Sequence, residues 1–421
     1  MEKYDEKLEE IKNLLRPTEE EKERFHSIFD EIKKSLEKIG KVDLMGSVAK
    51  DTFIKGHREI DVFVFIERSK QVKEALSEIK NALKDKKIEI AYAHHPYLRT
   101  YINNIRVDIV PAYYIEEGEK PITAVDRTRL HKDYVLKNIK EEQKDEIRLL
   151  KKFLKNINTY GAEIKTEGFS GYFCECLIIK EGNFVNALKF FSELKYQLRD
   201  NKLFFPDPID ENRNIMASLS ERNFLKTFIA SKAFFKSKNI EDFFFFDHSK
   251  FKVDEKTISI KFEKPDVVED IRFGVLKRIA RACVNKLDEH GIIIKDYYVY
   301  EQKEDEKAYD YISFTFFDER PIKHKLIRSP PIYMKEYLKS FVEKHEKNGL
   351  LKFSKDGLIV VKEMPYKSVT AIIRNFLSSY KMKFYKNNAC KIIKMLTPYV
   401  ERELALEKFL LGGLNDNTKS G

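Results

Sequence analysis

Cysteine is scarce in this chain. The 421 residues include four cysteines, too few to hold a chain of this length together by disulfides. Cys174 and Cys176 flank Glu175 in a C-x-C spacing, which is not a standard zinc spacing. Because Cys283 and Cys390 stand alone in the sequence, we expect all four cysteines to be reduced residues of the core.

Membrane and export signals are also missing from the sequence. No apolar run approaches the roughly 18 residues that a membrane-spanning helix needs. The segment 1–17 is charged and amphipathic, without the apolar stretch of a secretory signal. The sequence therefore predicts a cytoplasmic protein with no membrane association.

Charged residues are abundant. They make up 35% of the chain and hydrophobic residues 42%, a balance typical of a globular rather than a disordered protein. The length allows about two to four domains with sizeable cores. The 79 basic and 69 acidic side chains leave a formal charge of +10. This excess fits a polyanionic partner, although many lysine-rich proteins share it.

The stretch 46–61 carries the most informative pattern. With its flanks it predicts a strand over 42–45, a glycine-serine turn, a short helix, and a second strand over 59–66. Strand side chains alternate between two faces, so Glu59 and Asp61 share one face. Two acids on an otherwise apolar strand are costly to bury unless they are paired or hold a cation. Taken alone, the pattern would favour a solvated edge of an antiparallel sheet.

Two neighbours of this stretch favour a metal site. Gly46 and Ser47 open the short helix, where free backbone N–H groups and the helix dipole favour phosphate. Asp108 lies among apolar residues of a later strand. A tight turn at Asn103 and Asn104 would bring that strand beside the one that carries Glu59 and Asp61. Three carboxylates beside a phosphate-binding turn are the ligands that a site for two Mg²⁺ ions needs.

These motifs resemble those of a known superfamily. A Gly-Ser pair, a strand with two acids and a lone Asp on a later strand are similar to the signature of polymerase-beta-like nucleotidyltransferases. The longer string GSVAKDTFIKGHREIDVF resembles archaeal class I CCA-adding enzymes, which are tRNA nucleotidyltransferases. The resemblance implies that Glu59 and Asp61 hold one Mg²⁺ on the nucleotide phosphates. Together with Asp108 they would hold a second ion on the primer 3′-hydroxyl. We expect a rival carboxylate, Asp43, to be structural.

The same resemblance implies a set of nucleotide contacts. Ser47 and Lys50 lie one helical turn apart, so both could face the triphosphate, although Lys50 alone could equally be a solvated lysine. In the family this position is often arginine, which could bind a phosphate through two donors. Gly46 would belong to the same phosphate-binding turn.

Three further strings extend the resemblance into the middle of the chain. The segment AVDRTRLH implies that Thr128 contacts the ribose and that His131 contacts the triphosphate. The strings RLLK and YGAE imply phosphate contacts from Lys151 and Tyr160. The string DPIDENRN implies that Arg213 reads the edge of the incoming base. Without the resemblance, each would be an ordinary capping or surface residue.

The predicted fold class is α+β with several domains. We expect a nucleotidyltransferase head with a mostly antiparallel sheet over 1–135, a helical central domain that completes the nucleotide pocket over 136–250, and an α/β C-terminal tRNA-binding body and tail over 251–421. Periodicity and turn residues predict further helices over 184–198, 215–235, 266–289 with Ile271 facing inward, 366–380 and 390–411, and a hairpin turn at 355–357.

The resemblance places the grip on tRNA in the C-terminal region. Lysines interleaved with aromatic residues there could contact the RNA backbone: Lys381, Lys383, Lys386, Lys391 and Lys394. For any one of them, a solvated helix face is an equally good explanation.

Together these features predict a template-independent, Mg²⁺-dependent enzyme that adds or repairs the 3′-terminal CCA of tRNA from CTP and ATP. An alternative enzyme is a poly(A) or oligoadenylate-type polymerase built on the same head. An alternative outside catalysis is an RNA-binding protein with a relic head. By analogy with the family, the protein could form a homodimer.

Overall fold

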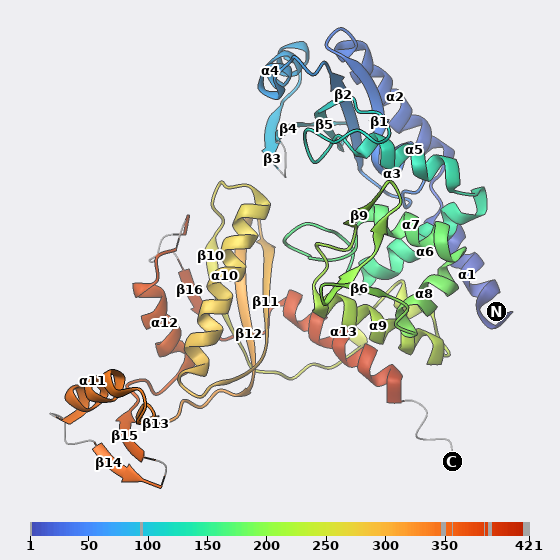
Figure 1. The fold of residues 1–421 in the computed structure, drawn as a ribbon. Helices are drawn as coiled ribbons and strands as arrows, with labels where there is room; N and C mark the ends of the chain where they lie inside the picture. The colour runs from blue at the N-terminus through green and yellow to red at the C-terminus, as the bar shows by residue number, and fades with distance from the viewer. Residues whose placement is uncertain are drawn as a thin grey trace. The chain divides into compact units, whose positions relative to one another are not determined.

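A computed structural model describes residues 2–92, 96–346, 351–355, 357–382, 384–385 and 390–415 (Figure 1). The chain forms two compact units. Unit 1 is Met1–Phe251 with Ala405–Gly421, and unit 2 is Lys252–Leu404. No helix within the described ranges is long and apolar enough to cross a membrane.

Unit 1 begins with two helices, α1 (Glu2–Leu15) and α2 (Glu19–Leu36). Thr18 caps α2: its hydroxyl accepts from the N–H of Glu21, whose side chain accepts from the N–H of Thr18. The buried face of α2 packs against one face of the head sheet, together with α4 (Val72–Ala82).

The head sheet is mostly antiparallel, as predicted. Its strand order is β1-β2-β5-β4-β3, and β2 and β5 are its one parallel pair. The strand bounds are β1 (Lys41–Met45), β2 (Glu59–Ile66), β3 (Glu89–Tyr92), β4 (Pro96–Ile102) and β5 (Ile105–Tyr113). Asn103 and Asn104 form the tight turn between β4 and β5 with φ of 51° and 62°. This turn returns the chain so that β5 lies beside β2, and the predicted placement of Asp108 is confirmed.

The rest of unit 1 is mainly helical, around a core rich in phenylalanine. Its helices are α5 (Thr128–Asn138), α6 (Glu141–Asn156), α7 (Gly171–Glu181), α8 (Phe184–Ser192) and α9 (Glu221–Lys236), followed by two 3₁₀ turns, η1 (Glu241–Phe243) and η2 (His248–Lys250). Two small hairpins join it: β6 (Gln197–Arg199) with β7 (Lys202–Phe204), and β8 (Pro206–Asp207) with β9 (Asp210–Asn214). The second half of α13 (Pro398–Asn415) completes this core.

Two predicted helices of this region are wrong in extent. The helix expected over 184–198 ends at Ser192, because Leu194 has a positive φ of 54° and the chain then enters β6. The helix expected from 215 begins only at Glu221, where the hydroxyl of Ser220 accepts from the N–H of Asn223 and caps it.

Unit 2 contains a four-stranded antiparallel sheet and a smaller three-stranded sheet. The larger sheet has the order β11-β12-β10-β16, with β10 (Thr257–Glu263), β11 (Ile293–Glu304), β12 (Lys307–Asp318) and β16 (Cys390–Ile393). Helices α10 (Glu269–Asp288) and α12 (Val369–Ser379) pack against it. The smaller sheet joins β13 (His324–Arg328), β15 (Gly357–Glu363) and β14 (Leu351–Ser354), and α11 (Lys335–His345) lies between β13 and β14 in sequence.

The structure corrects the predictions for unit 2 at two places. Ile271, expected to face inward, is 50% exposed, and α10 instead buries Phe273 and Leu276. Residues 390–393 form strand β16 rather than the start of a helix, because β10 pairs with them. The expected hairpin of β14 and β15 is present, while Asp356 in its turn lies outside the described residues. All four cysteines are free thiols, and Cys390 is half-buried rather than in the core.

Candidate active site

Two of the predicted catalytic carboxylates lie side by side. Asp61 of β2 and Asp108 of β5 are partners in the parallel register, so their side chains leave the sheet on the same face. Glu59 lies two residues earlier on that face, opposite Arg106. Further along the same face, Phe63 is buried in a second cluster of apolar residues. The acids therefore form the polar end of an otherwise apolar face.

The carboxylates repel one another. Burial and, after it, the negative charges of Asp108 and Glu59 together raise the pKa of Asp61 to about 6. Oxygen ligands that crowd negative charge are the donor set that hard divalent cations prefer. By its chemistry, the donor set at this end of the sheet fits such an ion.

Two arginines that the sequence analysis missed neutralise these acids. Arg99 of β4 donates two hydrogen bonds to Asp108, from Nε to Oδ1 at 2.7 Å and from Nη2 to Oδ2 at 2.9 Å. Arg106 of β5 donates from Nη2 to Glu59 at 2.6 Å, and its Nε lies 3.4 Å from Oδ2 of Asp108. In this arrangement no group of three His, Cys, Asp or Glu side chains within the described ranges is placed to hold a metal ion.

Gly46 brings the phosphate-binding turn against Asp61. It begins the four-residue helix α3 (Gly46–Ala49) with a positive φ of 67°. A Cβ added at Gly46 would collide with Oδ2 of Asp61. Only glycine combines this backbone conformation with this close approach. Ser47 follows in the same turn and is half-buried. The rival carboxylate Asp43 pairs with Lys132 instead.

The two predicted phosphate lysines meet at a buried glutamate. Glu175 of α7 accepts from Lys50 at one oxygen, and from Thr52 at 2.6 Å and Lys151 at 3.1 Å at the other. Burial would raise the pKa of Glu175, but the charges of the two lysines outweigh it and hold the pKa at about 2. Lys50 is thus buried rather than solvated. Two lysine side chains therefore share one carboxylate, and burial lowers the pKa of Lys151.

Tyr160 lies beside the same cluster. A Cβ added at Gly171, the first residue of α7, would lie 2.9 Å from the Tyr160 hydroxyl and 3.8 Å from Nζ of Lys151. The hydroxyl and the ammonium group therefore converge on the start of α7, where backbone N–H groups are free of helix partners. Thr128 begins α5 and is half-buried.

A second buried carboxylate joins the predicted base-reading and triphosphate residues. Asp207 of β8 is fully buried and accepts from Nη1 of Arg213 at 2.6 Å and from the Tyr172 hydroxyl at 2.9 Å. Nε2 of His131 lies 3.0 Å from the same carboxylate, and its ring stacks on Tyr172 at 4.0 Å. Burial would raise the pKa of Asp207, but hydrogen bonds from His131, the Ile209 N–H and Arg213 hold it at about 2.

These clusters influence one another electrostatically. Burial lowers the pKa of His131 against the opposing effect of the Asp207 carboxylate, and the charges of Arg213 and Lys50 add to the lowering. The charge of Lys50 also partly offsets the raised pKa of Asp61. The structure thus brings the acids, the buried lysines and the Asp207 cluster into one region. Asp207 could have been found from the sequence, because it belongs to the same string as Arg213.

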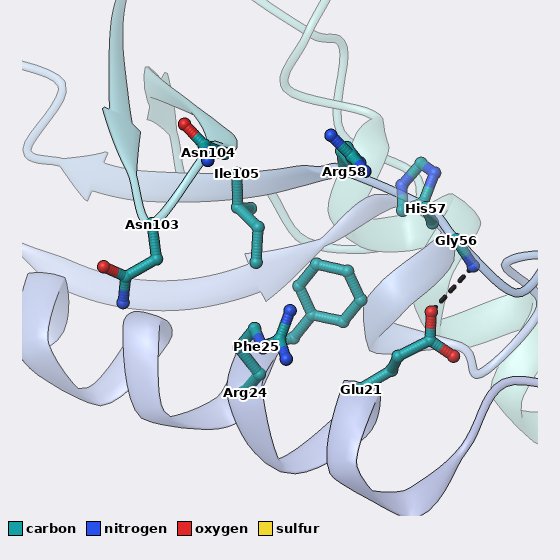
Figure 2. A pocket seen from close by; sticks show the side chains of 9 residues that line it. All are labelled: Glu21, Arg24, Phe25, Gly56, His57, Arg58, Asn103, Asn104 and Ile105. Atoms are coloured by element: carbon teal, nitrogen blue, oxygen red, sulfur yellow. Dashed lines mark hydrogen bonds between the residues drawn. The ribbon is translucent and has the colours of Figure 1, made fainter.

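A separate pocket is lined by other residues of unit 1 (Figure 2). It has a volume of about 210 Å³ and is lined by α2, the loop before β2 and the β4–β5 turn. Glu21 accepts there from the N–H of Gly56 at 2.7 Å, and Arg58 and His57 line the mouth. None of the three predicted catalytic acids lines this pocket.

The fold and the comparisons define the class of the protein. Residues 26–131 match the family model "Nucleotidyltransferase domain", and residues 145–245 match "tRNA nucleotidyltransferase, second domain". The protein is therefore a nucleotidyltransferase, and enzymes of this superfamily generally use divalent metal ions.

Curated relatives define the family more closely. A CCA-adding enzyme of Saccharolobus islandicus is 38% identical over 303 residues, which cover 68% of this chain and 73% of that enzyme. One from Pyrobaculum islandicum is 31% identical over 401 residues, covering 90% and 94% of the two chains. The chain belongs to the family of CCA-adding enzymes. The predicted resemblance to CCA-adding enzymes is confirmed. Neither the poly(A)-type polymerase nor the non-catalytic RNA-binding protein is favoured.

Among solved structures, a cytoplasmic RNA terminal U-transferase aligns with a TM-score of 0.46 at 11% identity, over 58% of this chain and 98% of that chain. At this level the similarity carries no argument about function.

Proposed function

We propose that this CCA-adding enzyme extends tRNA 3′ ends with CTP and ATP, using two Mg²⁺ ions held by Glu59, Asp61 and Asp108. The observation that supports the proposal is the register of β2 and β5, which places Asp61 and Asp108 side by side. When bound, the ions would make the 3′-hydroxyl a stronger nucleophile and neutralise charge on the phosphates. In the reaction, the 3′-oxygen bonds to the α-phosphorus and pyrophosphate leaves.

The remaining residues bind the nucleotide in this proposal. Gly46 and Ser47 present the turn to the triphosphate, and the side-chain nitrogens of Lys50 and Lys151 donate to its phosphates. The Tyr160 hydroxyl donates to a phosphate.

The Asp207 cluster supplies the other end of the nucleotide pocket. His131 meets the triphosphate, and Thr128 meets the ribose. Arg213 carries donors only, so it suits the acceptor atoms of cytosine and N1 of adenine.

The RNA contacts stay predictions. Lys381, Lys391 and Lys394 are exposed in unit 2, and Lys391 lies on β16 rather than on a helix. Lys383 and Lys386 lie outside the described residues. A homodimer and a cytoplasmic location also stay predictions.

The decisive experiment replaces the paired acids by their amides. In Asp61→Asn and Asp108→Asn, incorporation of CMP into tRNA lacking CCA should fall by about a thousandfold or more, because several kcal/mol of charge stabilisation is lost. Asp43→Asn is the matched control and should stay within about tenfold of the unaltered protein. If activity survives in both variants, Asp61 and Asp108 are not the ligands of catalytic metal ions. Long tails of A without added C would instead favour a poly(A)-type enzyme.

A further inference from the structure

The two arginines of the acid cluster are held in place by strand register. In the antiparallel pairing of β4 and β5, Arg99 lies directly opposite Asp108. In the parallel pairing of β2 and β5, Arg106 lies directly opposite Glu59. Cross-strand neighbours of opposite charge meet without any loop having to move. The two contacts are therefore part of the sheet itself.

These guanidinium groups occupy the oxygens that a metal ion would need. Arg99 takes both oxygens of Asp108 as a two-pronged donor. Arg106 spans Glu59 and Asp108. The carboxylate of Asp61 has no hydrogen bond or ion pair with the part of the chain that the structure describes, and it is the one acid of the three left open.

We propose that Arg99 and Arg106 are resident counter-cations that divalent ions must displace, so that the two arginines set the metal affinity of this site. The inference rests on the proposed function, because it takes Glu59, Asp61 and Asp108 to be the metal ligands. An ion that enters at Asp61 gains a second carboxylate only when the Arg99 fork leaves Asp108 or Arg106 leaves Glu59. Metal binding is then an exchange rather than a simple addition.

The structure contains features that make such an exchange possible. Nη2 of Arg99 also donates to the Tyr97 hydroxyl at 2.8 Å, and the guanidinium lies 5.5 Å from the centre of the Tyr97 ring. Tyr97 therefore holds the guanidinium after it releases Asp108. Nε of Arg106 is buried without a hydrogen-bond partner, so its 3.4 Å contact with Asp108 is weaker than a hydrogen bond and easier to break.

The test measures metal binding directly on the full chain. Mn²⁺ is titrated without nucleotide or tRNA, free Mn²⁺ is followed by electron paramagnetic resonance, and Mg²⁺ is titrated by calorimetry. Arg99→Gln and Arg106→Gln should each bind Mn²⁺ about tenfold more tightly than the unaltered protein. Arg99→Lys keeps the charge but cannot form the two-pronged contact. It should therefore also bind more tightly, by about threefold or more.

Arg58→Gln is the matched control for charge alone. Arg58 immediately precedes β2, is exposed and lines the pocket of Figure 2, which none of the three acids lines. Its Mn²⁺ affinity should stay within about twofold of the unaltered protein. If Arg99→Lys binds like the unaltered protein while Arg99→Gln and Arg58→Gln both tighten, the effect is only one of net charge and the proposal is overturned.

Failure of the inference can be told apart from failure of the proposed function. Asp61→Ala should abolish the Mn²⁺ site. If it does so while the Arg99 and Arg106 variants leave the affinity unchanged, only the exchange is refuted. If Asp61→Ala leaves Mn²⁺ binding intact, the metal ligands are misassigned and both proposals fall. Thermal unfolding of each variant identifies any that does not fold, and Arg106→Gln provides a second route if Arg99→Gln is unstable.

Discussion

A single buried carboxylate, Asp207, holds two residues that the proposed mechanism assigns to the nucleotide. In Asp207→Asn the amide keeps one acceptor oxygen but cannot balance the charge of Arg213. We expect KM for CTP and ATP to rise about tenfold, equivalent to about 1.4 kcal/mol, and discrimination against UTP to weaken. KM for tRNA should not change. Steady-state kinetics with each substrate varied in turn give these values.

The control for Asp207 lies on the next strand. Asp210 of β9 is half-exposed, and its carboxylate lies 3.5 Å from Arg127. Asp210→Asn should leave nucleotide KM unchanged. Equal effects in the two variants would show that the loss comes from the hairpin as a whole rather than from the carboxylate of Asp207.

Glu175 gives a prediction about pH. Its pKa is lowered from 4.5 to about 2 in the folded protein. A lowered folded pKa gives stability that is present above the unfolded pKa and is lost as pH falls through the folded pKa. Glu175→Gln should therefore cost about 3 kcal/mol of unfolding free energy at pH 7, at 1.36 kcal/mol per unit of pKa. The cost should shrink as pH falls from about 4.5 towards 2.

Urea unfolding at several pH values tests this dependence. Glu181→Gln, at the last turn of the same helix α7, is the control and should cost less than about 0.5 kcal/mol at every pH. A cost for Glu175→Gln that does not change with pH would mean that the ion pairs with Lys50 and Lys151 are not its source.

At the scale of elements, Gly46 can be compared with Gly56, a second glycine between β1 and β2. Gly46 and Gly56 both have a positive φ, of 67° and 79°. A Cβ at Gly46 collides with Asp61, whereas a Cβ at Gly56 has no atom within 4 Å. Both alanine variants should lose about 1 kcal/mol of stability from backbone strain. Gly46→Ala alone should also lose activity, by about a hundredfold or more, because it displaces a catalytic carboxylate.

Stability and CMP incorporation are measured together for this pair. Similar activity in Gly46→Ala and Gly56→Ala, at similar stability, would contradict the close approach of the turn to Asp61.

The head was predictable from the sequence because its signals are local. Period-2 alternation in 59–66 predicts the strand that carries both acids, and the two asparagines at 103–104 predict the β4–β5 hairpin. The parallel pairing of β5 with β2 then brings Asp61 beside Asp108. The arginines were missed because their role depends on register across three strands. From the sequence alone, Arg99 is an ordinary strand residue, because its pairing opposite Asp108 becomes known only from the structure.

Non-local pairing explains the other errors. The segment 390–393 has an apolar pattern compatible with a helix, and it becomes a strand because β10, more than a hundred residues away, offers hydrogen bonds along its edge. The hairpin of β8 and β9 likewise forms by strand pairing within a Pro- and Asx-rich segment. Local propensity does not predict secondary structure well where pairing with a distant strand determines it.

At the scale of the whole molecule, the chain returns to unit 1 at its end. Leu406 and Leu410 of α13 are buried in the phenylalanine-rich core of unit 1, and Phe409 packs on Phe243 with ring centres 4.8 Å apart. The sequence predicted a closing helix here but assigned 251–421 to one C-terminal region. Residues from Ala405 onward instead cluster with unit 1, so the last turns of α13 should stabilise the part of the chain that holds the site.

Leu406→Ala tests this dependence, with Leu411→Ala as its control on the same helix. Leu406 is fully buried and Leu411 is 46% exposed, so the first change should cost about 2–5 kcal/mol and the second less than about 0.5 kcal/mol. Hydrogen exchange read by mass spectrometry locates the effect, because faster exchange should appear in peptides of α6 and α9. Faster exchange confined to β10–β12 of unit 2 would show that α13 stabilises the other unit, and the assignment of its last turns to unit 1 would be wrong.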